Sequence, residues 1–181
     1  MVAFEDERGR IAQSQVGDHE AFESLIKEHQ RMIYSVCYRM TGSMAEAEDL
    51  AQETFIAAFS NLKGFRAESR FSSWLYRIAM NQCLNWRRGA ARRENLHKQW
   101  SEQPQAHETG ETGVSQQIQE ALMKLNPKQR AAMVLTTYDG LNHAEAAKVL
   151  GCSETTVSWR LFAARAKLKR LLKDLKPGGK K

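Results

Sequence analysis

The stretch that most constrains the fold is residues 141–172, which predicts a helix, a tight turn and a longer helix. In the first helix Ala147 and Leu150 follow helical spacing, and Gly151 ends it because glycine adopts a left-handed backbone without steric cost. Ser153 then offers a hydroxyl that caps the next helix. The longer helix carries a stripe of apolar residues on one face: Val157, Leu161, Ala164, Leu168 and Leu172. The pattern indicates a helix-turn-helix.

A helix-turn-helix places the start of its second helix in the major groove of DNA, where side chains reach base edges and cations reach phosphates. The candidate DNA contacts are the residues that face away from the apolar stripe or flank it: Thr155, Thr156, Ser158, Trp159, Arg160, Phe162 and Arg165. Trp159 and Phe162 are suited to packing on thymine methyl groups or sugars. An ordinary helical hairpin with a solvated basic face is the alternative.

Composition favours an all-helical protein of one or two small domains, since 42% of the 181 residues are hydrophobic and only three are proline. No apolar run is long enough to span a membrane, and the N-terminus lacks a signal-peptide core, so we expect a cytoplasmic protein. Cys37, Cys83 and Cys152 form no ligand spacing with the histidines, which predicts reduced core thiols and no metal site. No motif for catalysis or phosphate binding occurs, so we expect neither an enzyme nor a cofactor.

The formal net charge of +6 is distributed unevenly along the chain. Residues 1–62 and 96–115 carry an excess of acidic side chains, whereas residues 63–95 and 116–181 carry an excess of basic ones. Basic blocks attract phosphate, while an acidic leading block repels DNA and suits a basic protein partner.

Two helices are expected before residue 63, capped by Asp18 and Ser43. On the second of these helices, the i, i+3, i+4, i+7 spacing of a continuous surface patch is occupied by Asp49, Gln52, Glu53 and Ile56. An exposed isoleucine among acidic side chains is typical of a protein contact. From spacing alone, however, a solvated face with one stray apolar residue is the favoured interpretation.

The segment KGFRAESRFSSWL predicts a polar and aromatic loop that leads into a helix over residues 71–88. The predicted inner face of this helix comprises Phe71, Leu75, Ile78, Ala79, Gln82 and Trp86, and the outer face comprises Arg77, Asn81, Leu84 and Arg88. Basic residues, an amide and loop aromatics suit single-stranded or melted nucleic acid, whose bases stack on rings. Phe71 and Trp74 are equally well explained as core residues.

Residues 96–115 are polar, mildly acidic and without helical periodicity, which predicts a flexible linker in which Trp100 suggests docking in a partner groove. A second helical domain follows, with Pro127 in a first helical turn. The expected organisation is an N-terminal tail over 1–17, a first domain over 18–95, the linker, a second domain over 116–175 and a disordered tail over 176–181.

Four motifs share an order along the chain: DLAQETF at 49–55, FRAESRFSSWLYRIAMN at 65–81, LNPKQR at 125–130, and the terminal helix-turn-helix. Together, and with the linker in its expected place, they resemble a bacterial extracytoplasmic-function (ECF) sigma factor over about residues 18–175. The resemblance implies an all-α protein of two small helical domains that binds core RNA polymerase and directs it to promoters. The second domain would be a winged-helix-like four-helix unit ending in the helix-turn-helix.

The resemblance also implies roles for three groups of residues. The surface for the clamp helices of the largest polymerase subunit would comprise Asp49, Gln52, Glu53 and Ile56. The minus-ten element would be recognised and melted, with one base flipped from the non-template strand, by Arg66, Ser69, Phe71, Ser72, Ser73, Trp74, Arg77, Asn81 and Arg88. Asn81 is the preferred base-edge contact, and the minus-thirty-five element would be read by the candidate DNA contacts of the terminal helix.

Two positions depart from the family's common pattern. Trp159 stands where a small hydroxyl residue is usual, and Ala163 where a basic one is frequent, so the promoter sequence does not transfer. Because many relatives are restrained by an anti-sigma factor, the resemblance also implies such a factor as a candidate partner, and the free protein is expected to be a monomer.

Two readings from other classes of protein stay open. A polymerase-independent helix-turn-helix repressor would need a dimer to read a two-fold operator, and it leaves the acidic patch and the aromatic loop unexplained. A protein-interaction module explains the patch but not two separate basic blocks.

Overall fold

The computed structural model describes residues 2–97 and 113–173, and the regular elements within these ranges are all helical. In chain order they are α1 (Val2–Gln15), α2 (His19–Thr41), α3 (Met44–Asn61), η1 (Leu62–Gly64), α4 (Phe71–His97), α5 (Val114–Met123), α6 (Pro127–Met133), η2 (Val134–Tyr138), α7 (His143–Leu150) and α8 (Glu154–Leu171). The predicted all-α class is confirmed. Among the described helices, none is both long and apolar enough to cross a bilayer.

Helices α2, α3 and α4 form a first bundle, with α2 and α3 beginning at the predicted caps. The Asp18 carboxylate accepts a hydrogen bond from the Ala21 amide at 3.0 Å, and the Ser43 hydroxyl accepts one from the amide of Glu46. Between the two helices, Gly42 adopts a left-handed φ of 75°. The core of the bundle includes Leu25, Ile33, Val36, Leu50, Leu75 and Ala79. The result is a packed scaffold whose outer faces carry the candidate site residues.

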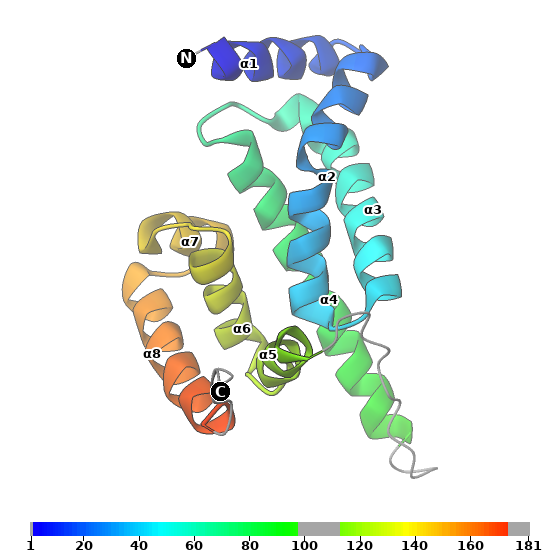
Figure 1. The fold of residues 1–181 in the computed structure, drawn as a ribbon. Helices are drawn as coiled ribbons and strands as arrows, with labels where there is room; N and C mark the ends of the chain where they lie inside the picture. Colours follow the sequence, from blue (N-terminus) through cyan, green and yellow to red (C-terminus); the bar gives the residue numbers. More distant parts are fainter. Residues whose placement is uncertain (1, 98–112, 174–181) are drawn as a thin grey trace, which may run out of the picture.

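Part of the segment predicted as an N-terminal tail forms helix α1, which lies across one end of the first bundle (Figure 1). Its Ile11 side chain is buried against this bundle, and the Arg10 guanidinium donates hydrogen bonds to Ser24 and Glu28 of α2. Most of the contacts that hold α1 on the bundle are polar. The helix therefore lacks the apolar periodicity from which it could have been predicted.

Helix α4 extends to His97, past its predicted end at residue 88, and α5 begins at Val114. Both ends of the predicted linker over 96–115 therefore belong to helices. The middle of that linker, including Trp100, lies outside the described residues.

Helices α5 to α8 form a second bundle, whose capping follows the expected chemistry. Asn126 and Asn142 each begin a helix with a reciprocal side-chain and backbone capping box. Gly151 adopts a φ of 59°, and the Ser153 hydroxyl accepts a hydrogen bond from the Thr156 amide at 3.2 Å. The predicted apolar stripe of α8 is buried at Val157, Leu161 and Ala164. The helix-turn-helix geometry is thus set by local sequence.

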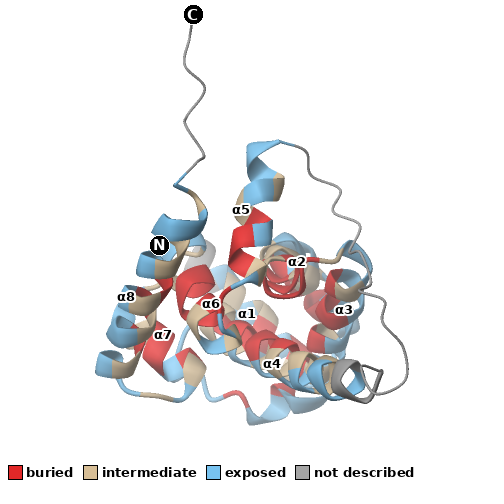
Figure 2. Cartoon of the chain, turned by 90° about the horizontal axis from the view of Figure 1, so that it is seen from below, coloured by how far each residue is buried: buried red, intermediate tan, exposed pale blue. Residues whose placement is uncertain are grey.

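The two bundles pack against each other, which the sequence did not predict. The Gln119 side chain of α5 donates a hydrogen bond to the Tyr38 carbonyl of α2 at 3.1 Å. A side chain at Gly42 would lie 3.0 Å from the Met123 side chain, so glycine permits this close approach as well as the turn. Figure 2 shows buried residues gathering where α2, α5 and α6 come together. On α4, the side chains of Tyr76, Met80 and Cys83 are also buried.

Candidate nucleic-acid and protein interfaces

The first candidate surface lies on α3 and comprises Asp49, Gln52, Glu53 and Ile56, which we call the α3 patch. All four residues are exposed, and 61% of Ile56 is accessible. The opposite side of the helix is buried at Ala47, Leu50 and Ala58. The predicted spacing therefore produces one continuous outer face, with an apolar side chain among carboxylates.

A groove of about 830 Å³ between α2 and α3 adjoins the α3 patch. Gln52 and Ile56 line it, so the patch forms part of its wall. The other apolar lining comes from Phe22, Ile26, Tyr34, Ala51, Phe55 and Phe59. The Phe59 ring is 41% exposed and packs against the Phe22 ring at 5.0 Å between centroids. Burial, followed by the charge of Glu48, raises the pKa of the Tyr34 phenol.

The α3 patch was expected from the sequence, whereas the groove was not. Phe59 lies one helical turn after Phe55 and three residues after Ile56, which is a signal that was available. Tyr34 lies on a different helix, and only the packing of α2 against α3 brings it into the same wall.

The second candidate surface is the segment 65–74, which we call the aromatic loop. The Phe65, Phe71 and Trp74 rings form one cluster, with centroids between 5.1 and 5.6 Å apart. Phe71 is only 2% exposed and Phe65 8%, so both belong to the core, while Trp74 is half-buried. Phe71 can therefore line a pocket for a DNA base only from the core side of that pocket.

Around this cluster the polar loop residues lie outward. Arg66 and Ser69 are exposed, and Ser72 and Ser73 are half-buried at the start of α4. Ala67 has a φ of 56°, a left-handed conformation that is unusual for a residue with a side chain. The loop thus presents hydroxyl and guanidinium groups on the outer side of a fixed cluster of aromatic rings.

The surface continues along α4, where Arg77, Asn81 and Arg88 are exposed as predicted. Leu84, also expected on the outer face, is instead half-buried and packs against the core. On the inner face Leu75 and Ala79 are fully buried, and the Gln82 side chain accepts a hydrogen bond from the Thr54 hydroxyl at 2.8 Å. The helix therefore has a packed inner side and a row of two cations and one amide outside.

The third candidate surface is the outer side of α8, which we call the α8 face. Trp159 is 66% and Phe162 69% exposed, and their rings meet edge to face at 6.0 Å between centroids. Thr155, Ser158 and Arg165 are exposed beside them, whereas Thr156 and Arg160 are half-buried. Two large rings held in water by a rigid helix indicate a surface that meets a partner.

Some α8 side chains are already engaged. The Ser158 hydroxyl lies 3.0 Å from Nδ1 of His143, and the Arg160 guanidinium lies 3.4 Å from the sulfur of Cys152. These contacts join α8 to α7 and to the turn between them. The exposed guanidinium of Arg165 lies about two turns after Ser158 along the helix.

The three surfaces belong to separate elements. Figures 1 and 2 show α3 and α8 on opposite sides of the molecule, with α4 between them. A single chain therefore offers one acidic and apolar face and two faces with aromatic and basic side chains.

Both halves of the chain match families of known proteins. Residues 25–93 match the family described as Sigma-70 region 2, and residues 115–168 match Sigma-70, region 4. The chain is 35% identical to the ECF RNA polymerase sigma factor SigW of Bacillus subtilis, covering 92% of this chain and 96% of SigW. It is 34% identical to SigM of Mycobacterium tuberculosis, covering 93% and 85%. A solved structure of the sigma factor RpoE from Bartonella quintana, in complex with the anti-sigma factor NepR, has a TM-score of 0.72 at 25% identity, covering 86% of this chain and 98% of that one.

Proposed function

The chain belongs to the ECF group of bacterial RNA polymerase sigma factors, and we propose that it works through the α3 patch, the aromatic loop with α4, and the α8 face. A sigma factor of this group binds core RNA polymerase and directs promoter-specific initiation of transcription. The observation that carries the residue assignment is the placement of all three exposed surfaces within the two matched regions.

The polymerase contact is assigned to the α3 patch together with the groove beside it. Ile56 and Phe59 provide exposed apolar area, and Asp49 and Glu53 provide negative charge at the edge. Such a surface fits an amphipathic helix that carries basic residues beside its apolar face, in keeping with clamp helices as the partner. In this proposal the groove supplies most of the affinity and the carboxylates select the partner.

The minus-ten element is assigned to the aromatic loop and to the outer side of α4. A flipped base would enter above Trp74, with Arg66, Ser69, Ser72 and Ser73 around it, while Phe71 supports the pocket from the core. The displaced strand would follow Arg77, Asn81 and Arg88, whose charges neutralise phosphates and whose amide reads a base edge. Extruding a base costs a few kcal/mol, which a preformed pocket offsets.

The minus-thirty-five element is assigned to the α8 face. Trp159 and Phe162 would pack on thymine methyl groups and sugars, while Thr155, Ser158 and Arg165 make polar contacts. Thr156 and Arg160 would act from the edge of the face, since both are half-buried.

An anti-sigma factor is proposed as a further partner, because the similar RpoE structure was solved with one. We place the protein in the cytoplasm, where core polymerase and the chromosome are found. The domain boundaries proposed from the sequence, 18–95 and 116–175, stand close to the matched regions 25–93 and 115–168. The repressor alternative finds no support in the comparisons.

The polymerase assignment is tested by titrating fluorescently labelled protein with core RNA polymerase. Ile56→Asp places a charge at the centre of the apolar surface, and we expect it to weaken binding by about tenfold or more. Val114→Asp is the matched control, because Val114 is 63% exposed but lies on α5, away from the groove. Equal affinities for Ile56→Asp and the unsubstituted protein would remove the α3 patch from the interface.

A further inference from the structure

We propose that helix α1 is a positioning element for the aromatic loop, and that the Gln15 side chain sets the loop in the conformation that reads the minus-ten element. This inference rests on the proposed role of the aromatic loop and adds a segment that lies outside both matched regions.

The most direct link is the Gln15 amide. Its Nε2 donates one hydrogen bond to the Leu62 carbonyl at 2.9 Å and another to the Phe65 carbonyl at 2.8 Å. Leu62 and Phe65 are both buried; Leu62 begins η1, and Phe65 follows the end of η1 as the first residue of the aromatic loop. One side chain therefore uses both of its N–H donors to fix the backbone turn that leads into the loop.

A second link runs through the ring cluster. The His29 ring of α2 lies 5.5 Å from the Phe71 ring, and its Nε2 lies 3.1 Å from a carboxylate oxygen of Glu7 on α1. His29 is only 7% exposed. The orientation of this ring, against which Phe71 packs, thus depends on a side chain from α1.

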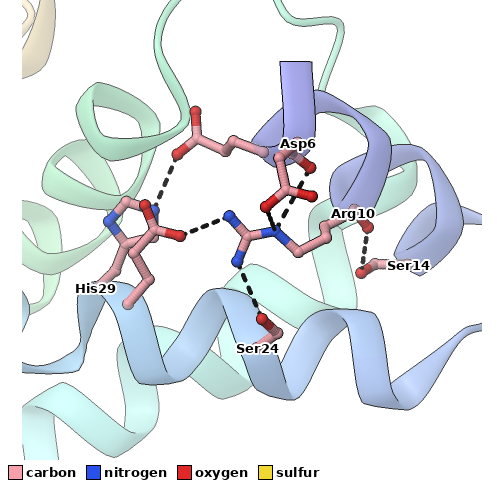
Figure 3. A network of polar contacts seen from close by, with 7 residues as sticks. Asp6, Arg10, Ser14, Ser24 and His29 are labelled. Carbon is pink, nitrogen blue, oxygen red and sulfur yellow. Dashed lines mark hydrogen bonds and ion pairs between the residues drawn. The ribbon is translucent and has the colours of Figure 1, made fainter. Parts of the chain in front are cut away.

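Helix α1 is itself held firmly on α2 by the network in Figure 3. The Arg10 guanidinium contacts the Ser24 hydroxyl at 3.0 Å and the Glu28 carboxylate at 2.7 Å. Within α1 itself, the Ser14 hydroxyl donates to the Arg10 carbonyl at 2.7 Å. Carboxylate oxygens of Glu7 and Glu28 and a ring nitrogen of His29 lie within 4.8 Å of one another, a spacing that would suit a metal ion. Because Arg10 already neutralises Glu28, the group acts as an ion-pair network that fixes α1.

The loop needs such support because its own backbone hydrogen bonds lie at its two ends. The Phe65 amide donates to the Leu62 carbonyl, and the Trp74 amide donates to the Arg70 carbonyl. Residues 66–70 between them are exposed, and Ala67 carries a left-handed backbone. A loop ordered before binding loses less conformational entropy when it captures a base, so fixing its first turn raises affinity for the melted strand.

The test uses holoenzyme assembled from core polymerase and the full chain. The probe is a fluorescein-labelled non-template oligonucleotide that spans the minus-ten element of a promoter mapped by run-off transcription. Gln15→Glu keeps the length of the side chain but removes both N–H donors. We expect it to weaken oligonucleotide binding by about tenfold. Gln13→Glu is the matched control, because it adds the same negative charge at an exposed position on the same helix.

Two further measurements separate positioning from a general loss of fold. Affinity for core polymerase and affinity for a duplex carrying only the minus-thirty-five element should both stay within about twofold of the unsubstituted protein. If all three affinities fall together in Gln15→Glu, the residue is merely structural and the inference is wrong. If oligonucleotide binding is unchanged, it is also wrong. If the unsubstituted holoenzyme fails to bind the oligonucleotide, it is the proposed role of the loop that fails.

Discussion

The buried guanidinium of Arg130 on α6 donates a hydrogen bond to the main-chain carbonyl of Met40 on α2, 90 residues earlier in the chain. The same group donates to the Leu122 carbonyl at 2.8 Å and to the Met123 carbonyl at 2.6 Å. These carbonyls stand at the C-terminal ends of α2 and α5, where helix dipoles concentrate negative charge. One guanidinium therefore supplies hydrogen-bond donors to the free carbonyls at the C-terminal ends of two helices from different bundles. Burial lowers the pKa of Arg130 to about 10, so it remains charged at neutral pH.

Arg130→Met should lower the free energy of unfolding by about 2 to 4 kcal/mol, because it leaves several buried carbonyls without a donor. Urea unfolding followed by circular dichroism measures this change. Lys128→Met, at an exposed position on the same helix, should change stability by less than about 0.5 kcal/mol. Equal losses for the two variants would mean that the Arg130 hydrogen bonds contribute nothing specific.

Asp139 should make stability depend on pH. Burial raises its pKa to about 6, although the Arg39 charge and a hydrogen bond with Tyr76 oppose the rise. In the unfolded chain an aspartate titrates near about 3.9, so the native state binds the proton more tightly. The free energy of unfolding should therefore fall as pH rises from about 4 to about 6, and stay lower above that range.

The substitution that isolates this effect is Asp139→Asn, which stays neutral at every pH. Relative to the unsubstituted protein, the variant should gain roughly 1 to 2 kcal/mol between pH 4 and pH 7.5, allowing for the partial exposure of the group. Denaturant titrations at the two pH values measure the gain. The same stability difference at both values would show that Asp139 titrates alike in the folded and unfolded states.

Trp159→Ala should weaken binding to the upstream promoter element by more than about 1 kcal/mol, since the indole is exposed and held beside Phe162. Trp159→Phe keeps an aromatic ring and should lose less. Fluorescence anisotropy with labelled duplex measures both affinities. Unchanged binding by Trp159→Ala would refute a direct role for this side chain.

Local chemistry explains why much of the fold could be predicted. Asp18, Ser43, Gly151 and Ser153 act within a few residues of their own positions, so their capping roles are visible in the sequence. The α8 stripe and the exposed α3 patch also follow from periodicity along one helix.

The features that escaped prediction depend on contacts between distant segments. Gln15 meets Phe65, and Tyr34 meets the α3 side of the groove, only after the helices have packed. Phe71 was equally consistent with core and pocket, because periodicity does not distinguish a ring beneath a surface from one upon it. The buried Tyr76 on α4 is covered by the second bundle. The packing of that bundle on α4 cannot be recognised from the spacing of apolar residues in the sequence.

Run-off transcription is the direct test of whether this chain directs core polymerase to promoters through its two matched regions. Purified core RNA polymerase is supplied with genomic fragments from the source bacterium, with and without the protein. We expect discrete transcripts that require the protein and are lost with Ile56→Asp but kept with Val114→Asp. Duplex binding by the protein alone, with no change in the start sites that polymerase uses, would contradict this expectation.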